Sequence, residues 1–408
     1  MKILVLNCGS SSAKFQLFDT NLDAIKGGTE TCLAKGIVEK IGEETSMRRI
    51  ECLGKPAFRE VVPIPSHTEA IRLIIEMLTH PEYGIIKDKN EIDAVGHRVV
   101  HGGETFTHSC VIDERVLAKI KECIQLAPLH NPHNVRGYEI AKSLLGETPH
   151  VAVFDTAFHQ TMPASSFIYA LPYEYYEKKR IRRYGFHGTS HRYVARRIGR
   201  LFNLPKEAYS VITVHLGNGA SIAAVQKGRV MDTSMGFTPL EGLVMGTRCG
   251  DIDPAILMYL IESDGADVAS LNRILNKQSG LIGISGISND MRELEKASKN
   301  GNKRAALAID IFCYRIRKYI GAYTVAMGGV DFVAFTAGIG ENSVLVREKC
   351  SEGLEAIGAV IDKEKNRAMN GKEGVFSTDA SKVRLCVIPT NEEILIAHDT
   401  VEAVSGLL

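Results

Sequence analysis

Residues 2–19 read KILVLNCGSSSAKFQLFD, two apolar runs joined by a short segment of small, hydroxyl-bearing residues. An apolar run bounded by glycine and serine is typical of a buried strand. A turn of such small residues lets backbone N–H groups approach an anion closely, and Lys14 would add a positive charge. The stretch therefore predicts a strand, a phosphate-binding turn that carries the lysine, and a second strand. An ordinary β-hairpin with a polar turn is the alternative interpretation.

A similar pattern occurs twice more along the chain. Residues 210–225 read SVITVHLGNGASIAAV, again a strand, a glycine-rich turn and a strand. Residues 331–342 read DFVAFTAGIGEN, a strand that runs into a Gly-x-Gly turn. Three glycine turns at strand ends indicate a nucleotide held between two related halves. The sequence contains neither the P-loop signature nor the dinucleotide fingerprint after a strand, so the predicted phosphate site is of another type.

Composition and charge narrow the function classes. With 408 residues and 45% hydrophobic content, the chain can bury a large core and form two or three domains. A net charge of +1 argues against a polyanion as main partner, and the basic run at residues 178–183 is interpreted as a solvated face. No apolar stretch approaches the roughly 18 residues that span a bilayer, and no signal pattern precedes the first strand, which predicts a cytoplasmic protein. Nine scattered cysteines without a C-x-x-C pair indicate reduced thiols.

Strands alternate with helices along the chain. Helical spacing of apolar residues predicts helices after Ser66, where Ser-His-Thr-Glu is a candidate capping box, and around residues 309–323. Strands are predicted at residues 95–101 and 151–155, which end on polar residues, and at 385–388, which precedes Pro389-Thr-Asn-Glu392. Because ligands of open α/β sheets gather beyond such strand ends, Arg98, Asp155 and Glu392 become candidate site residues.

Histidines and arginines supply further candidates. His187 and His191 have the spacing of a zinc pair, but glycine replaces the glutamate of the H-E-x-x-H motif, so metalloprotease chemistry is not expected. Histidines 97 and 101 would share one face of the predicted strand, with Arg98 on the other. Arg98 and Arg248 stand in glycine-rich segments. Their planar guanidinium groups suit an anionic substrate and a transferring phosphoryl group, whereas structural salt bridges are the alternative.

Five segments together resemble the acetate kinase family, also called the acetokinase family. They are NCGSSSAKF at 7–15, GHRVVHGG at 96–103, DTAFHQTMP at 155–163, YGFHGTSH at 184–191 and FTAGIGEN at 335–342. The resemblance runs in order to Asn391 and Glu392. It implies membership of the acetate and sugar kinase, Hsc70 and actin superfamily, and hence an α/β fold with two duplicated actin-like (ribonuclease H-like) domains around a nucleotide cleft. The implied domains are 1–156 plus 393–408, and 157–392.

The resemblance also implies an activity. The reaction is reversible, Mg²⁺-dependent transfer of the γ-phosphoryl group of ATP to acetate by direct in-line attack, giving acetyl phosphate and ADP. The alternative is a kinase for propionate or another short-chain fatty acid. The implied cation is Mg²⁺, with Mn²⁺ as its substitute, and ATP or ADP is the co-substrate. A homodimer is expected, without nucleic-acid or membrane partners.

Site residues follow from the resemblance position by position. The implied catalytic residues are Arg98, Asp155, His187 and Arg248. The implied acetate site comprises Arg98, Val100, Leu129, Phe186 and Pro239, and the implied metal ligands are Asn7 and Glu392. The implied nucleotide-binding residues are Lys14, His215, Leu216, Gly217, Asn218, Gly219, Asp290, Met291, Arg292, Gly338, Ile339, Gly340, Glu341 and Asn342. Met291 stands where some relatives carry phenylalanine beside the adenine, which leaves the nucleotide preference open.

Asp155 is usually assigned as the acid or base of this family. A carboxylate acceptor is already ionised near neutral pH and offers no proton to remove. We therefore expect Asp155 to orient Arg248 or the hydrated metal ion.

Two other classes fit parts of the sequence. Ser11 and Lys14 form an S-x-x-K motif, as in serine acyl-enzyme hydrolases, but the companion K-T-G and S-D-N motifs are missing. An ATP-driven chaperone of the same superfamily would need a peptide-binding domain, whereas the motifs here continue almost to the last residue.

Overall fold

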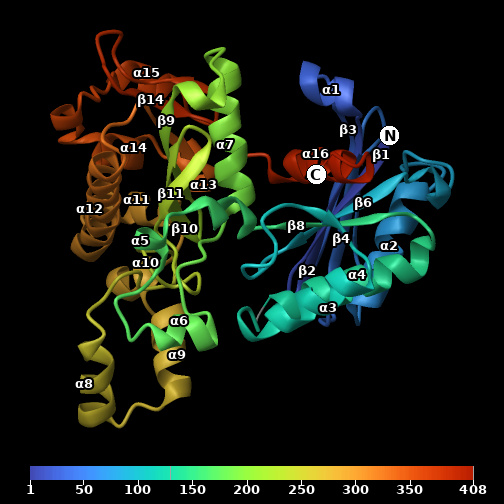
Figure 1. Ribbon diagram of the computed structural model, residues 1–408, viewed down its shortest axis with the longest axis horizontal. Helices are drawn as coiled ribbons and strands as arrows, with labels where there is room; N and C mark the ends of the chain where they lie inside the picture. The colour runs from blue at the N-terminus through green and yellow to red at the C-terminus, as the bar shows by residue number, and fades with distance from the viewer. Residues whose placement is uncertain (129, 408) are drawn as a thin grey trace. The chain divides into compact units, whose positions relative to one another are not determined.

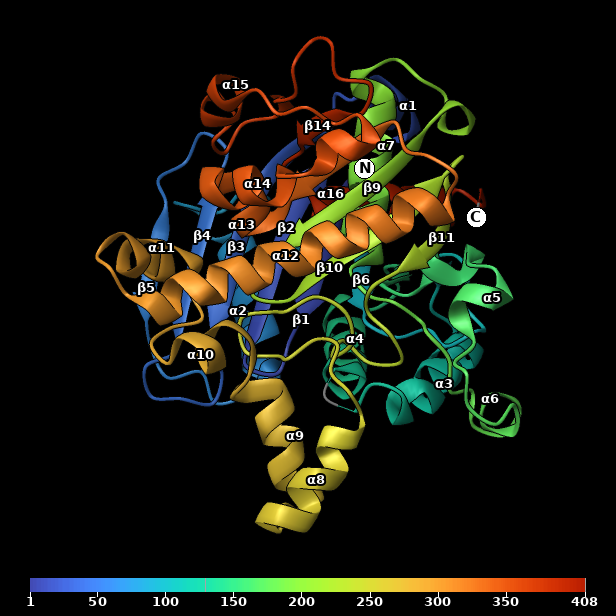
Figure 2. The same ribbon diagram turned by 90° about the vertical axis from the view of Figure 1, so that its left-hand side faces the viewer.

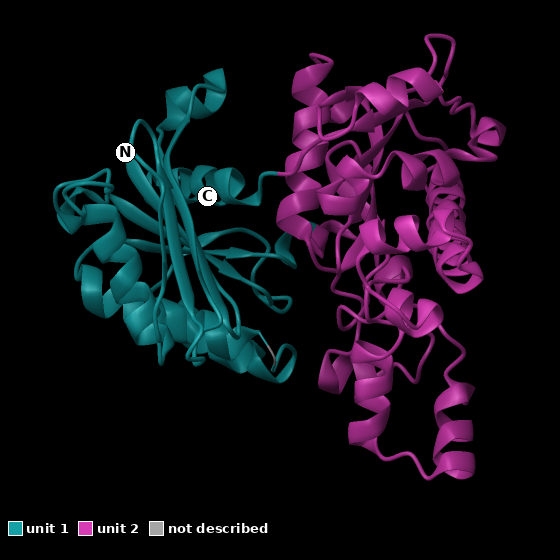
Figure 3. Ribbon diagram, turned by 180° about the vertical axis from the view of Figure 1, so that it is seen from behind, with its two compact units in different colours: residues 1–158, 391–408 teal, residues 159–390 magenta. Residues whose placement is uncertain are grey.

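The computed structural model describes residues 1–128 and 130–407. The chain divides into two compact units, Met1–Phe158 with Asn391–Leu408, and His159–Thr390 (Figure 3). Each unit is built around one mixed β-sheet. None of the helices in the described residues is both long and apolar enough to cross a lipid bilayer.

The sheet of the first unit has the strand order β5-β4-β3-β2-β1-β6-β8-β7 (Figure 1). Strands β1 and β2 form the hairpin predicted from residues 2–19, in a register that pairs Asn7 with Lys14. Strands β1, β6 and β8 run parallel, so their carboxyl ends meet at one edge. The strands are β1 (Lys2–Cys8), β2 (Ser12–Asp19), β3 (Thr31–Glu39), β4 (Met47–Cys52), β5 (Phe58–Val61), β6 (Ala94–Val99), β7 (Cys110–Val111) and β8 (His150–Phe154).

Helices cover both faces of this sheet. Along β1, Leu4 and Leu6 pack with α2 and α4, whereas Ile3 and Val5 pack with α16, as the alternation of side chains in a strand requires. Ser66 caps α2 by accepting a hydrogen bond from the backbone of Glu69. The helices are α1 (Leu22–Gly27), α2 (His67–Thr79), α3 (Glu114–Glu122), α4 (Asn131–Leu145) and α16 (Glu392–Val404), with single turns at Lys89–Glu91 and Cys123–Gln125.

The sheet of the second unit repeats this topology. Its order is β11-β10-β9-β12-β14-β13, with β9, β10 and β11 antiparallel and β9, β12 and β14 parallel. The first five strands therefore correspond one by one to β3, β2, β1, β6 and β8 of the first unit. The predicted α/β fold with two duplicated domains is confirmed. The strands are β9 (Ser210–Leu216), β10 (Ala220–Gln226), β11 (Arg229–Thr233), β12 (Phe332–Thr336), β13 (Gly374–Val375) and β14 (Arg384–Val387).

A long helix, α12, lies across β9 and β10 of the second unit (Figure 2). Helices α8 and α9 form an arm that projects from the rest of this unit (Figure 2). The helices are α5 (Ala164–Phe167), α6 (Glu174–Lys179), α7 (Gly188–Leu201), α8 (Ala255–Asp264), α9 (Val268–Lys277), α10 (Gly280–Ser285), α11 (Met291–Lys299), α12 (Lys303–Ala326), α13 (Ala337–Asn342), α14 (Val344–Ser351) and α15 (Lys363–Ala368), with single turns at Ala157–Thr161, Lys206–Ala208 and Leu354–Ile357.

Some local predictions were wrong. Lys14 lies in β2 and not in the turn, and the S-x-x-K serine sits before a strand instead of at a helix start, which removes the acyl-enzyme interpretation. The Gly-x-Gly segment at Gly338–Gly340 forms the short helix α13. Strand β6 ends at Val99, so His101 lies beyond the strand that was expected to hold it.

The basic run at residues 178–183 is only partly a solvated face. Arg182 is buried, with its guanidinium carbon 3.6 Å from the centre of the Phe167 ring. Arg183 donates to the backbone oxygens of Thr233 and Ser234 at 2.9 and 3.1 Å. These two arginines stabilise the interior of the second unit instead of forming a charged surface.

Candidate functional site

The first unit gathers its candidates at the carboxyl edge of its parallel strands. Asn7 shares the face of β1 with Ile3 and Val5, which packs against α16. Arg98 shares a face with Gly96, where an added Cβ would meet Ile396 and Thr400 of α16. Glu392 is the first residue of α16, which Asn391 caps by accepting from the Ile394 N–H at 3.1 Å. Asn7, Arg98 and Glu392 therefore lie on the same side of the sheet.

Arg98 is held by two carboxylates. Its Nε donates to Asp155 Oδ1 at 3.2 Å, and its Nη2 donates to Asp155 Oδ2. Glu392 Oε2 lies 3.7 Å from Arg98 Nε. The Nη1 group of Arg98 has no hydrogen-bond partner within the described part of the first unit, so it can still receive an anionic ligand. Asp155 thus orients Arg98 in this unit, and its expected role toward Arg248 or a metal ion stays a prediction.

Burial and charge act on this group in opposite directions. Burial disfavours the charged guanidinium of Arg98, but Asp155 and Glu392 outweigh it and keep the pKa of Arg98 above its usual value. Burial raises the pKa of Glu392 to about 7, although Arg98 opposes this. The negative charge of the Glu392 carboxylate is thus only partly compensated by positive charge on its neighbours in the unit.

The oxygen ligands near this edge fit a hydrated Mg²⁺ ion. Mg²⁺ prefers carboxylate and amide oxygens and keeps several of its waters. Asn7 offers an amide oxygen and Glu392 an under-compensated carboxylate on the same face of the sheet. The residues present therefore suit the predicted metal, which would supply positive charge to the phosphate oxygens.

The turn between β1 and β2 is stabilised by a contact that sequence reasoning missed. The Gly9 N–H donates to the Ser12 carbonyl at 2.8 Å, and His67 Nε2 donates to the Gly9 carbonyl at 2.8 Å. His67 begins α2, so this helix fixes the shape of the turn. Lys14 lies beyond it, directly across from Asn7 in the hairpin.

The residues predicted to enclose the acyl group are distributed over both units. Val100 is buried and follows the end of β6. Leu129 lies outside the described residues. Phe186, which is buried, and Pro239 belong to the second unit. A common pocket of these residues stays a prediction.

The second unit brings His187 and Arg248 together above Gly219. A Cβ added to Gly219 would lie 3.5 Å from both Arg248 Nη1 and His187 Cε1, so these two side chains converge beside this glycine. Arg248 Nη1 donates to the Pro239 carbonyl at 3.2 Å. Burial lowers the pKa of Arg248, and no carboxylate within the described part of this unit pairs with it. Such a half-buried, uncompensated cation is suited to bind an anion.

His187 is oriented by a chain of hydrogen bonds. It has a left-handed φ of 54° at the start of α7, and its Nδ1 lies 2.8 Å from Ser221 Oγ. Ser221 Oγ also lies 2.8 Å from His191 Nε2, and His191 Nδ1 lies 2.7 Å from Thr213 Oγ1. Burial lowers the pKa of His191 well below its usual value, so this ring stays neutral. The i, i+4 spacing of His187 and His191, which resembles that of a zinc pair, thus lets both rings contact the same serine.

The first nucleotide segment, His215–Gly219, joins β9 to β10. The ring of His215 stacks on that of His187, with 4.2 Å between their centres. Leu216 is buried at the end of β9, and Gly217 N–H donates to the Gly219 carbonyl at 3.1 Å. Asn218 accepts from the Asn289 side chain at 2.9 Å.

The second nucleotide segment lies at the start of α11. Asp290 caps this helix by accepting from the Arg292 N–H at 2.9 Å, and the two side chains also form a salt bridge of 2.6 Å. Met291 is buried, whereas Arg292 is exposed. The polar groups of this segment therefore belong to Asp290 and Arg292.

The third segment is α13, which Arg347 stabilises through hydrogen bonds. It contains Gly338, Ile339, Gly340, Glu341 and Asn342. This arginine is fully buried and donates to the carbonyls of Gly340 and Glu341 at 2.9 and 2.8 Å. Glu341 in turn accepts from the Thr390 N–H at 3.0 Å. Neither Arg347 nor Thr390 belongs to a recognisable motif, so the sequence held no signal for them.

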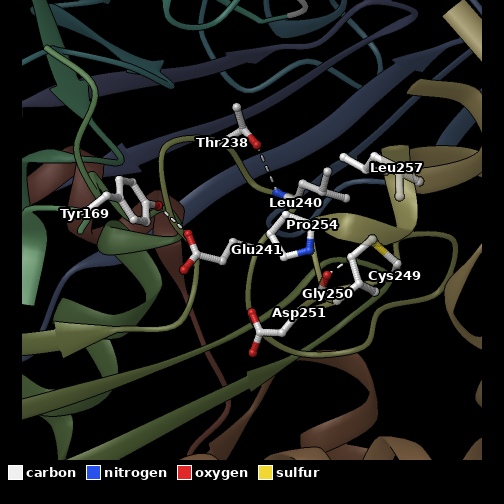
Figure 4. Close-up of a pocket in the computed structure, with 11 residues that line it drawn as sticks. Tyr169, Thr238, Leu240, Glu241, Cys249, Gly250, Asp251, Pro254 and Leu257 are labelled. Carbon is white, nitrogen blue, oxygen red and sulfur yellow. Dashed lines mark hydrogen bonds between the residues drawn. The ribbon is translucent and has the colours of Figure 1, made fainter. Parts of the chain in front are cut away.

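A cavity of about 380 Å³ lies beside the loop that carries Pro239 and Arg248 (Figure 4). Tyr169 and Glu241 point toward each other at one side of it, and Cys249 and Leu257 line another. None of the predicted site residues lines this cavity. It is a neighbour of the His187 and Arg248 cluster and not a part of it.

Two buried histidines behind Arg98 predict a pH-dependent stability. His97 Nε2 and His150 Nδ1 share a hydrogen bond of 2.8 Å beside Tyr138. Burial lowers the pKa of His150 from 6.5 to about 4, and lowers that of His97 well below 6.5. As pH falls from 6.5 toward 4, the unfolded chain binds protons that the folded chain does not. The free energy of unfolding should then fall by up to about 1.4 kcal/mol per pH unit for His150 alone.

Urea unfolding at pH 7 and pH 5 measures this effect. Asn at position 150 keeps a polar group near His97 but cannot bind the proton, so His150→Asn should lose less stability over this interval than the wild type. Equal losses in the two proteins would rule out His150 as the source.

The comparisons with known proteins agree in sequence and in structure. A family model described as the acetokinase family matches residues 2–398. The acetate kinase of Halothermothrix orenii is 54% identical over 406 residues, covering 100% of both chains. That of Caldanaerobacter subterraneus subsp. tengcongensis is 55% identical over 408 residues, again with 100% of both covered.

Solved structures show the same likeness. The acetate kinase of Porphyromonas gingivalis has a TM-score of 0.93 at 48% identity, with 99% of each chain covered. A propionate kinase from Francisella tularensis has a TM-score of 0.90 at 41% identity, with 100% of each covered.

Proposed function

This chain belongs to the acetokinase family, and we propose that it catalyses reversible transfer of the γ-phosphoryl group from Mg²⁺-bound ATP to acetate. A carboxylate oxygen forms the new bond to phosphorus, the bond from phosphorus to the β-phosphate oxygen breaks, and acetyl phosphate and ADP result. The observation that carries the proposal is Arg248, a half-buried cation next to His187 that has no carboxylate partner among the described residues of its unit. Its missing counter-ion is supplied by the transferring group.

The first unit is assigned to the acceptor and the metal. Arg98 binds the acetate carboxylate through the nitrogen that Asp155 leaves available. Asn7 and Glu392 hold Mg²⁺ directly or through water, with Mn²⁺ as the substitute cation. Since the acceptor is already a carboxylate, no base is required, and Asp155 acts by keeping Arg98 charged and in place.

The second unit is assigned to the donor. Arg248 and His187 stabilise the charge on the equatorial oxygens of the phosphoryl group, which is the main requirement of this reaction. Residues His215–Gly219, Asp290–Arg292 and Gly338–Asn342 are assigned to the nucleotide, and Lys14 is assigned to its phosphates. The transfer then proceeds in line, without a covalent enzyme intermediate.

A hydroxamate assay tests the proposed reaction directly. The enzyme is incubated with ATP, Mg²⁺ and one of a series of short carboxylates, and hydroxylamine traps any acyl phosphate. Acetate should give the highest kcat/KM. A product formed with propionate but not with acetate would replace the assignment by the alternative, a propionate kinase.

Substituting Val100 should change the choice of acid. A small apolar pocket discriminates one methylene by about 1 to 3 kcal/mol, so the wild type should accept propionate less well than acetate. Val100→Ala removes two methyl groups and should raise the propionate-to-acetate ratio of kcat/KM, mainly through KM. An unchanged ratio would show that Val100 does not line the acyl pocket.

The proposal includes a cytoplasmic homodimer. The α8 arm carries large apolar side chains that are exposed in the single chain, namely Ile256, Met258, Tyr259 and Ile261. A second copy of the chain would cover such a surface, since an exposed apolar patch commonly marks an interface. Sedimentation analysis of the purified protein gives its mass and tests this assignment.

A further inference from the structure

The segment that carries Val100 is held by side chains and not by a neighbouring strand. Beyond the end of β6, three successive backbone N–H groups each donate to a side-chain oxygen. Val100 donates to Asn134 Oδ1 at 3.0 Å, His101 to Asn131 Oδ1 at 3.1 Å, and Gly102 to Thr156 Oγ1 at 3.1 Å. The position of Val100 therefore depends on the first turn of α4.

Asn134 differs from Asn131 because it connects two strands. Strands β1 and β6 are paired as far as Leu6 and His97. Beyond that pair, Asn134 donates from Nδ2 to the Cys8 carbonyl at 2.9 Å while its Oδ1 accepts from Val100. Its amide thus replaces the missing strand pairing between the ends of β1 and β6. Asn131 instead donates back to the His101 carbonyl at 2.9 Å.

The close packing of α4 on β1 allows this bridge. Gly137 lies three residues after Asn134, on the same face of the helix. A Cβ added to Gly137 would lie 2.7 Å from Cys8 Sγ, which is closer than real side chains approach. Asn134 itself is 5% exposed, so water cannot readily replace its two hydrogen bonds.

We propose that Asn134 is a positioning residue that sets the width of the acyl pocket by holding Val100 against the end of β1. This inference rests on the proposed function, since it assumes that Val100 borders the acyl group. A pocket that distinguishes acids by one methylene is sensitive to small shifts of its wall. Weakening the bridge lets Val100 move away, so a longer acid gains and acetate loses its close fit.

Asn134→Asp tests the bridge with little change in shape. The aspartate still accepts from the Val100 N–H, but its second oxygen faces the Cys8 carbonyl and cannot donate to it while ionised. We expect the propionate-to-acetate ratio of kcat/KM to rise about threefold or more. At lower pH the protonated carboxyl group donates again, so the ratio should return toward that of the wild type measured at the same pH.

Asn131→Asp is the matched control. It introduces the same charge in the same helical turn and removes the hydrogen bonds that Asn131 Nδ2 donates to the His101 carbonyl at 2.9 Å and the Ile120 carbonyl at 3.4 Å, none of which involves Val100 or β1. Its melting temperature should fall while its propionate-to-acetate ratio stays within about twofold of the wild type. If Asn134→Asp does not fold, Gly137→Ala serves instead, since its methyl group pushes α4 away from Cys8 and should raise the ratio.

The double variant Val100→Ala with Asn134→Asp completes the test. Without the valine methyl groups, the bridge has less of the pocket wall to position. The propionate-to-acetate ratio of the double variant should therefore resemble that of Val100→Ala, and its increase should be smaller than the product of the two single-variant increases. Multiplicative effects, or an Asn134→Asp ratio equal to that of the wild type, would overturn the inference. If the wild type forms no acetyl hydroxamate, the proposed function is refuted. The ratio of kcat/KM between the acids that the wild type does use would still test Asn134, when it is compared with the ratio of Asn134→Asp.

Discussion

Replacing Arg248 by alanine is expected to lower kcat by about 10²- to 10³-fold while leaving the melting temperature unchanged or higher. The activity falls because the variant loses a preformed donor to the charge that develops on the phosphoryl group. Stability does not fall, because Arg248 is a partly desolvated cation that no carboxylate of the described second unit compensates. Removing it therefore also removes a desolvation penalty.

Steady-state kinetics and thermal unfolding of the same preparation measure both effects. Guanidine added to Arg248→Ala should restore part of the activity, since it can occupy the vacated site. Arg317→Ala is the matched control, because Arg317 lies on α12 and pairs at 3.3 Å with Glu352 on the surface. Near-normal turnover of Arg248→Ala would remove this arginine from the mechanism.

Replacing Arg98 by alanine should reduce activity by a similar factor but should also destabilise the protein. The variant loses the donor for the acetate carboxylate, which lowers kcat/KM for acetate by about 10²- to 10³-fold. It also leaves Asp155, which is 1% exposed, without its bidentate partner, and breaking a buried ion pair costs about 3 to 5 kcal/mol. The motif alone would predict a variant with an intact fold.

The double variant Arg98→Met with Asp155→Asn separates these two consequences. It removes both charges and keeps the volume of the arginine side chain, so it should recover part of the melting temperature that Arg98→Ala loses. Its activity should stay as low as that of the single variant. A double variant no more stable than Arg98→Ala would show that the ion pair is not the source of the loss.

Much of the fold could be predicted from local pattern. Apolar runs bounded by glycine predicted the hairpins β1–β2 and β9–β10, because a buried strand and a tight turn depend on residues close together in the chain. The rule that ligands gather beyond the ends of parallel strands selected Arg98, Asp155 and Glu392, which the first unit brings together. Motif resemblance added the family, which the comparisons confirm.

Other local predictions were wrong where a contact with a residue distant in sequence outweighed the local preference. Glycines at 338 and 340 predicted a turn, but the stretch forms a short helix whose carbonyls Arg347 satisfies from below. A basic run predicted a solvated face, yet Arg182 and Arg183 find an aromatic ring and backbone carbonyls inside the second unit. In each case the deciding partner is distant in sequence and leaves no local signal.

Patterns along the chain were enough to predict the strand–turn units, their repetition in two halves and the residue types that carry the chemistry, because these follow from spacing and from the chemistry of single side chains. Which of these side chains become hydrogen-bond or ion-pair partners follows only from the tertiary structure. Asp155 holds Arg98, Arg248 has no carboxylate partner in the described second unit, and Asn134 joins Val100 to Cys8, which lies 126 positions before Asn134 in the chain. Such partnerships depend on which buried polar groups packing brings within hydrogen-bond distance, and no periodicity along the chain encodes that distance.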